Sequence, residues 1–257
     1  SELEILNDGE LIYATKGKAT SSDNNLEIDA LEYEYSQKSN ILKAKNGTAY
    51  IKSDNIKIIF KEIFIDQNSQ ILTSEQNVKI FDLKKNIIIE TNSINFDQKK
   101  KILKSSTTST LRDNFNNYFT TANFNYNFFE NILKLENANF KDSQNNFFEI
   151  ESGFLNTKTN KLIGKDISID LDNKSFNKEN DPRLKGKSVT INDGVTKVNK
   201  GVFTTCKRRD KCPPWQISAE EIKHDKKKKN INYKNAWLKI YDVPVMYFPK
   251  FFHPDPT

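Results

Sequence analysis

Pairs of neighbouring apolar residues recur along the chain at an interval of about thirty residues. The first members of six such pairs are spaced 30, 30, 31, 30 and 30 residues apart. The pairs are Leu11-Ile12, Ile41-Leu42, Ile71-Leu72, Ile102-Leu103, Ile132-Leu133 and Leu162-Ile163. Polar segments with the composition of tight turns precede five of them, at 7–10, 36–40, 66–70, 97–101 and 157–161. A fixed interval of this size is typical of repeat architectures.

A second set of apolar residues alternates with polar residues ahead of each turn. These residues stand eight and six positions before each pair: Leu3 and Ile5, Tyr33 and Tyr35, Ile63 and Ile65, Ile94 and Phe96, Phe124 and Tyr126, with Phe154 alone in the sixth unit. Alternation before a turn and an apolar pair after it predict a β-hairpin with one buried face. Two weaker hairpins are expected around the turns 192–194 and 225–230, preceded by Val189, Ile191, Ile222 and His224.

These hairpins predict an all-β protein. Ile, Val, Thr, Tyr and Phe dominate the periodic segments and favour strands. One hairpin cannot bury its own apolar face, but stacked hairpins cover one another. The sequence therefore predicts an elongated, twisted β-jellyroll of stacked hairpin repeats of about thirty residues, folded into two facing sheets.

The inward-facing residues of such a fold are candidates for ligand contact. If the two sheets splay, the apolar interior becomes a groove that can hold acyl chains. If they do not, the same residues form an ordinary packed core, and the sequence alone favours this simpler interpretation. The candidates taken from the alternation are Ile63, Ile65, Ile94, Phe96, Phe124, Tyr126, Phe148 and Ile150.

Composition narrows the range of partners. The chain has 257 residues, of which 36% are hydrophobic and 29% charged, and its net charge is +6. A mild positive excess favours an anionic partner. The lysines are spread evenly rather than clustered with aromatic residues, which argues against a nucleic-acid binder. The lysine run 226–229 could contact phosphates, although a solvated hairpin tip explains it more simply.

Motifs for catalysis are missing from the sequence. There is no phosphate-binding loop, no dinucleotide-binding glycine motif and no zinc-protease motif. Cys206 and His224 could be imagined as a nucleophile and its base, but His224 is expected on the outer end of a strand. The spacing of the two cysteines, with only two histidines to assist, makes a metal site improbable. We expect no enzyme activity and no cofactor.

The last fifty residues form an ordered series of short motifs. They run through Thr204-Thr205-Cys206, Trp215-Gln216-Ile217, Glu221-Ile222-Lys223-His224-Asp225, Asn235-Ala236 and Val243-Pro244-Val245-Met246-Tyr247-Phe248-Pro249. This series resembles the N-terminal periplasmic region of the lipopolysaccharide-assembly family LptD, also called organic solvent tolerance protein. The preceding repeats are similar to the OstA-like domain of the same pathway. The resemblance covers the whole chain, and the C-terminal series is its specific part.

The resemblance implies a role in lipopolysaccharide transport and outer membrane biogenesis in a Gram-negative cell. Residues 1–240 would form the OstA-like jellyroll, with a cysteine-containing loop near 204–214, at the periplasmic face of the outer membrane. Residues 241–257 would connect to the first strand of an outer-membrane β-barrel. The module would receive lipopolysaccharide from a periplasmic jellyroll bridge, docked by strand addition at the N-terminal edge, and guide the lipid A acyl chains to the barrel and its plug lipoprotein.

The resemblance also bears on the two cysteines. Cys206 matches the cysteine that joins a disulfide to the barrel in relatives, whereas Cys212 departs from the family pattern. Cys206 and Cys212 could pair with each other, or each could pair with a barrel cysteine, and an oxidising periplasm permits both.

Two other functions stay open. The chain could be a stand-alone periplasmic lipopolysaccharide bridge or chaperone of the same fold, which should lack the C-terminal series. It could also be a structural β-solenoid that binds carbohydrate, an alternative kept open by the asparagine-rich turns.

Overall fold

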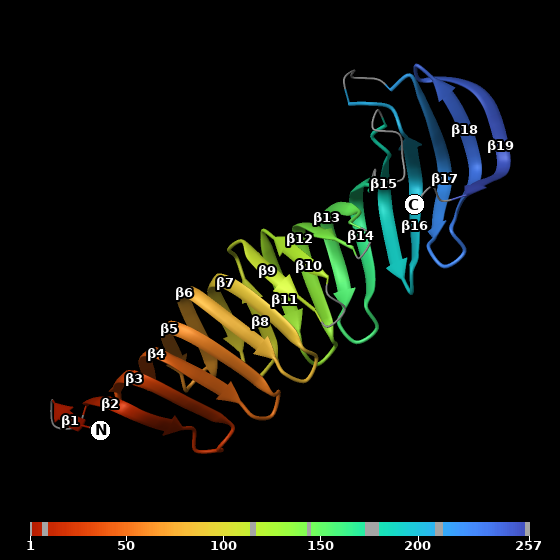
Figure 1. The fold of residues 1–257 in the computed structure, drawn as a ribbon. Coiled ribbons are helices and arrows are strands. Elements are labelled where there is room, and N and C mark those ends of the chain that lie inside the picture. Colours follow the sequence, from red (N-terminus) through yellow and green to blue (C-terminus); the bar gives the residue numbers. More distant parts are fainter. Residues whose placement is uncertain are drawn as a thin grey trace. The chain divides into compact units, whose positions relative to one another are not determined.

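A computed structural model describes residues 2–6, 10–113, 117–142, 145–172, 180–208 and 213–254. Within these ranges the chain forms nineteen β-strands and no helix, which confirms the predicted all-β class. The strands divide between two compact units, residues 1–133 and 134–257. Figure 1 shows the strands of each unit side by side as successive hairpins.

Unit 1 is a meander of antiparallel strands. Each strand from β1 to β7 pairs with the next one along the chain, after which β7 pairs with both β8 and β9. β8 pairs with β11, and β9 with β10. The strands are β1 (Glu2–Leu6), β2 (Leu11–Thr20), β3 (Leu26–Ser36), β4 (Ile41–Ile51), β5 (Ile56–Asp66), β6 (Ile71–Asp82), β7 (Ile87–Asp97), β8 (Ile102–Ser105), β9 (Ser109–Arg112), β10 (Tyr118–Thr121) and β11 (Asn123–Asn127).

Unit 2 continues the same hairpin pattern. β12 (Ile132–Lys141) begins at the boundary, and β13 to β19 pair in sequence order, all antiparallel. The strands after β12 are β13 (Phe147–Asn156), β14 (Lys161–Asp170), β15 (Arg183–Asn192), β16 (Val195–Thr204), β17 (Trp215–Asp225), β18 (Asn230–Ile240) and β19 (Val243–Pro254). β19 pairs with β18 along its length, so residues 243–254 of the expected connector extend this sheet.

The predicted turns at 36–40, 66–70, 97–101, 157–161, 192–194 and 225–230 are present, whereas residues 7–9 of the predicted turn at 7–10 lie outside the described residues. Turns occupy 37–40, 67–70, 98–101, 157–160, 193–194 and 226–229, and a further turn at 128–131 fills the polar-poor segment. In most of the four-residue turns the last residue has a positive φ, as in Asn40 at 56° and Asn160 at 56°. Asparagine tolerates this left-handed conformation better than other residues with a side chain, which explains the asparagine-rich turns.

Many of the long strands bend near their middle. Lys16, Asn46, Gln76, Asn137 and Asp166 each have a positive φ inside a strand, and the first three are 30 residues apart. The strand pairing skips the bend residue, as where Ala30 pairs with Gly47 and Glu32 with Lys45. The buried positions shift phase there by one residue, so that each half of the strand keeps its apolar side on the same concave face.

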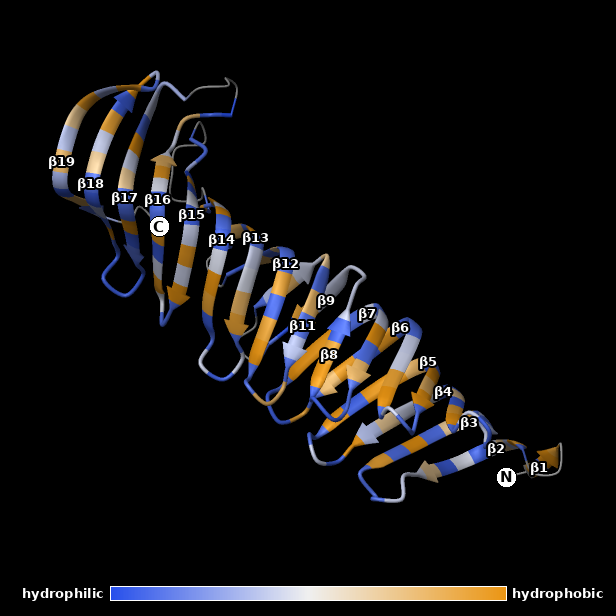
Figure 2. Ribbon diagram, turned by 180° about the vertical axis from the view of Figure 1, so that it is seen from behind, coloured by the Kyte–Doolittle hydropathy of each residue, from blue (hydrophilic) through white to orange (hydrophobic). Residues whose placement is uncertain are grey.

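Because the strands bend, their opposite ends come together within each unit. In unit 1, Lys101 in the turn after β7 pairs with Asp54 in the turn after β4, at 2.5 Å. In unit 2, Lys226 in the turn after β17 pairs with Asp142 beyond β12, also at 2.5 Å. Each unit is therefore rolled into two facing layers, with apolar side chains between them. Figure 2 shows the hydrophobic and hydrophilic residues alternating along the strands.

Two sequence-based expectations about burial are wrong. Phe154 is 48% exposed, because in β13 the inward register falls on Leu155. Ile163, the cross-strand partner of Phe154, also points outward. Leu3 and Ile5 are 68% and 58% exposed, because they lie in the first strand of the sheet, where few strands cover them.

Candidate functional site

The eight interior candidates all point into the rolls. In unit 1, the side chains of Ile63, Ile65, Ile94, Phe96, Phe124 and Tyr126 are buried, with at most 4% of their surface exposed. In unit 2, Phe148 and Ile150 are equally buried. The alternation in the sequence therefore identified inward positions correctly.

The interior of unit 1 contains an aromatic cluster beside a charged pair. The Tyr126 ring lies 4.1 Å from Phe128, and Phe96 meets Phe128 edge-on at 5.8 Å, between ring centroids. Lys85 Nζ donates to the Tyr126 hydroxyl at 2.7 Å and lies 4.9 Å from the centre of its ring. The Tyr126 hydroxyl donates to Asp82 at 3.0 Å. Burial lowers the pKa of Lys85, because desolvation disfavours the charged form of its amine.

Among the described residues of unit 2, side chains pack closely around Phe148. The enclosed space beside Phe148, Phe203 and His224 measures only about 10 Å³, which is about the room that one water molecule needs. Phe140 stacks on Phe148 with 4.5 Å between ring centroids. This part of the candidate interior is a packed core as it stands.

Unit 1, by contrast, has a cavity of about 550 Å³, which we call the seam cavity. It opens between the 21–25 connection on one side and the turns 67–70 and 98–101 on the other. Its walls are apolar and its rim is polar. The apolar lining residues are Ala19, Leu26, Ile28, Tyr35, Leu42 and Ile65, and the polar ones include Ser21, Asp23, Asn25, Asp66, Gln67, Gln70, Gln98 and Lys101.

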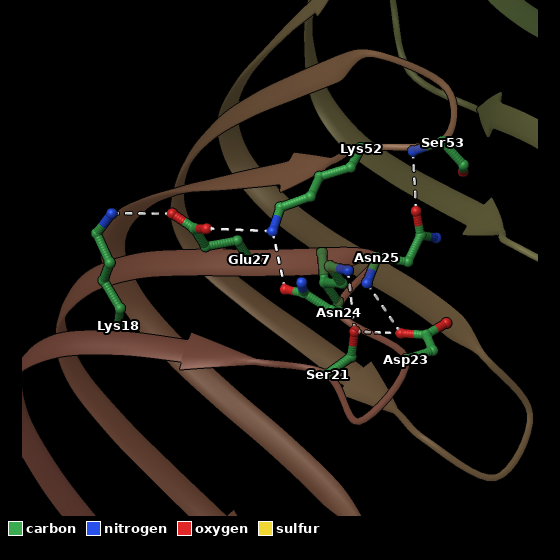
Figure 3. A network of polar contacts seen from close by, with 9 residues as sticks. Lys18, Ser21, Asp23, Asn24, Asn25, Glu27, Lys52 and Ser53 are labelled. Atoms are coloured by element: carbon green, nitrogen blue, oxygen red, sulfur yellow. Dashed lines mark hydrogen bonds and ion pairs between the residues drawn. The ribbon is translucent and has the colours of Figure 1, made fainter.

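One rim of the seam cavity is held by a network of polar contacts, shown in Figure 3. Asp23 accepts hydrogen bonds from the Ser21 hydroxyl at 2.5 Å and from the Asn25 backbone at 3.0 Å. These bonds, with that from Ser21 first, lower the pKa of Asp23. Asn25 also accepts from the Ser53 backbone at 2.9 Å, which ties this connection to the next turn along the same edge.

The opposite rim is tied along its edge in the same way. Asn40 Nδ2 donates to Asn68 Oδ1 at 2.8 Å, and Lys99 Nζ donates to the Asn68 carbonyl oxygen at 3.3 Å. The Tyr35 hydroxyl donates to Asn40 Oδ1 at 2.7 Å. Each edge is thus a connected series of turns. The sequence marked Tyr35 and Ile65 as inward residues, but it gave no sign that the edges would stand apart beside them.

The lysine run 226–229 and His224, also considered from the sequence, make contacts within the protein itself. Lys227 pairs with Asp193 at 2.7 Å, and Lys226 pairs with Asp142, so two lysines of the 226–229 run bind carboxylates of this chain. His224 is buried at 6% exposure, against the expectation of an outer position, because the inward register of β17 falls on Ile222 and His224.

Cys206 is a free cysteine whose Sγ lies 3.6 Å from the Trp215 carbonyl oxygen. Cys212 lies outside the described residues, so the structure gives the predicted disulfide no support. No group of three or more His, Cys, Asp and Glu side chains suited to a metal ion occurs among the described residues. The same part of the chain contains no helix of the length and apolar character needed to cross a membrane.

A scan against models of protein families finds no match for this sequence, and a search of curated proteins finds no similar one.

Proposed function

We propose that this chain is a periplasmic lipid-binding and transfer module of an outer-membrane lipopolysaccharide translocon, as its resemblance to the LptD family implies. It would receive lipopolysaccharide from a jellyroll bridge and pass it on to a β-barrel. The observation that carries the proposal is the seam cavity of unit 1, where an apolar interior reaches the surface beneath a polar rim.

The chemistry of this cavity suits an acyl chain. Ile28 and Ile65 on its walls are almost fully buried and continue into the row of inward residues that includes Ile63. Moving acyl CH₂ groups from water into such surroundings is favourable by roughly 0.8 kcal/mol each. Its volume of about 550 Å³ also falls within the range of ordinary ligand pockets, roughly 300–1,000 Å³.

The N-terminal strand is suited to a docking partner. Leu3, Ile5 and Leu6 of β1 are exposed apolar residues on a strand at the beginning of the sheet. Such a strand is a template for β-augmentation. This supports docking of a bridge protein near the end of unit 1 that contains the seam cavity.

The carbohydrate-binding alternative loses its main support. The asparagines that suggested it occupy left-handed turn positions, as Asn55 and Asn86 do with φ of 57° and 54°. Their presence therefore follows from backbone geometry and does not require a ligand.

Site-specific photo-crosslinking to lipopolysaccharide tests the proposal. A photoreactive residue would replace Tyr35 at the cavity wall, Phe96 deep in the roll, or the exposed Lys84 as an outward control. We expect lipopolysaccharide adducts at positions 35 and 96 and none at 84. Adducts at position 84 alone, or at none of the three in a protein with native circular dichroism, would show that the roll is a structural scaffold.

A further inference from the structure

In unit 1 the turns along one edge of the roll face the turns along the other edge. We call this line the seam and each pair of facing turns a crossing, and the crossings are equivalent. On the first edge, Asp23, Asp54 and Lys85 occupy corresponding places in the connections 21–25, 52–55 and 83–86, each 31 residues after the last. On the second edge, Gln70 and Lys101 are both the last residue of a four-residue turn, and both have a φ of 57°. Each crossing can therefore be compared with the next.

Two of these crossings are closed by a lysine. At the middle crossing, Lys101 Nζ lies 2.5 Å from Asp54 Oδ2 and 3.1 Å from the Ser53 hydroxyl. Both partners are partly buried, with side-chain exposures of 30% and 16%. At the following crossing, Lys85 reaches Tyr126 across the seam. A partly buried pair keeps more of its attraction than an exposed one.

The first crossing has the acid, but its own turn supplies no lysine. The nearest one is Lys101 of the next crossing, and after the hydrogen bond from Ser21 its charge also contributes to lowering the pKa of Asp23. Asp23 corresponds to Asp54, whereas Gln70 stands where Lys101 stands one repeat later. Both Asp23 and Gln70 are exposed, and no hydrogen bond or ion pair joins these two residues in the described structure. The seam cavity lies at this crossing, and Asp23, Gln70 and Lys101 are among its lining residues.

We infer that this crossing is a lateral loading port for the acyl chain of an amphiphile, held open because Gln70 replaces the lysine that closes the next crossing. The inference rests on the proposed function and adds the entry point and its controlling residue. The acyl chain enters sideways between the two edges of the roll, and the head group of the amphiphile stays at the polar rim. The Lys101–Asp54 pair marks the end of the open part of the seam.

Gln70→Lys tests the port by adding a lysine that can pair with Asp23, as Lys101 pairs with Asp54 at the next crossing. The probe is cis-parinaric acid, an eighteen-carbon fatty acid whose fluorescence rises in apolar surroundings, titrated into the full chain. We expect Gln70→Lys to raise its Kd at least tenfold. The double variant Gln70→Lys with Asp23→Asn keeps the added lysine but removes its partner, and we expect it to bind the probe nearly as the wild type does.

Equal probe affinity in the wild type and Gln70→Lys would overturn the port, as would equally weak binding by the single and double variants. Photo-crosslinking separates this failure from failure of the proposed function. Lipopolysaccharide adducts at position 96 that persist at wild-type yield in Gln70→Lys would leave the interior path standing and show that lipid enters elsewhere. Absence of both adducts and probe binding in the wild type would contradict the port and the proposed function together.

Discussion

Single side chains at the turns determine where each hairpin reverses. The last strand residue before the turn accepts backbone hydrogen bonds from within the turn, as Asp66 does from Asn68 and Ser69 at 2.9 and 3.2 Å. Asn127 and Asn156 do the same in later hairpins. Such capping of a turn by Asp or Asn is a local interaction that needs no tertiary contact. The turns could therefore be predicted from the sequence.

Asp66 should make part of the stability depend on pH. Its pKa is lowered, chiefly by the hydrogen bond from the Ser69 hydroxyl, so folding favours the ionised carboxylate. A lowered pKa contributes stability above the unfolded value of about 3.9, which is lost as the pH falls through the folded value. We expect Asp66→Asn to keep the turn but reduce the fall in Tm between about pH 5 and pH 3, measured by circular dichroism.

The reciprocal change provides the control. Asn127 occupies the same turn position as Asp66 and accepts from the Glu130 backbone at 3.0 Å. Asn127→Asp should steepen the acid-side fall in Tm. An unchanged pH profile in both variants would contradict the role assigned to this turn position.

At the scale of the strand, the bend is the feature that turns a flat meander into a roll. The residue after the bend faces inward and is often small, as with Gly47, Ala138, Gly201 and Ala236. A Cβ at Gly201 would meet Ile222 Cδ1 at 2.7 Å, so the concave corner has little room. The requirement for a small residue thus comes from side chains and backbone of the neighbouring, hydrogen-bonded strand.

This requirement explains what the sequence could not show. Period-two alternation predicted the half-strands before each turn, such as Ile63 and Ile65, because nothing interrupts them. Beyond the bend the phase shifts, so Ile56 and Ile58 of the same strand did not join the predicted face although both are buried. The shift at Phe154 was missed for a related reason, since one residue of slippage exchanges the two faces of a strand.

Two glycines at equivalent bends give a matched test. Gly17 and Gly47 follow the bend residues of β2 and β4, 30 residues apart. A Cβ at Gly47 would approach the Ala30 Cβ to 2.6 Å, whereas one at Gly17 would meet nothing within 4 Å. We expect Gly47→Ala to lower the free energy of unfolding by about 1–3 kcal/mol and Gly17→Ala to leave it within about 0.5 kcal/mol. Urea denaturation measures both, and equal losses would refute the crowded corner.

At the scale of the whole molecule, the two units differ in how they use the same repeat. Among the described residues, unit 2 leaves only about 10 Å³ beside Phe148 and has an open hollow of about 450 Å³ beside Ile150, whereas unit 1 has an apolar-walled cavity of about 550 Å³ at its first crossing. The repeat predicted the roll, but not this difference, because whether two edges meet depends on side chains such as Lys101 and Asp54, which come together across the seam only after folding. The proposed entry of lipid through unit 1 rests on this apolar-walled cavity.

The most direct test of an acyl path inside the roll is an NMR measurement of intermolecular contacts. Isoleucine δ1 methyl groups would be labelled, and nuclear Overhauser effects to the methylenes of a monomeric amphiphile recorded. Our account predicts contacts at Ile28 and Ile65, which line the cavity, and none at Ile59, which is 38% exposed on the outer face. Saturable binding with contacts at Ile59 and none at Ile28 or Ile65 would contradict the account.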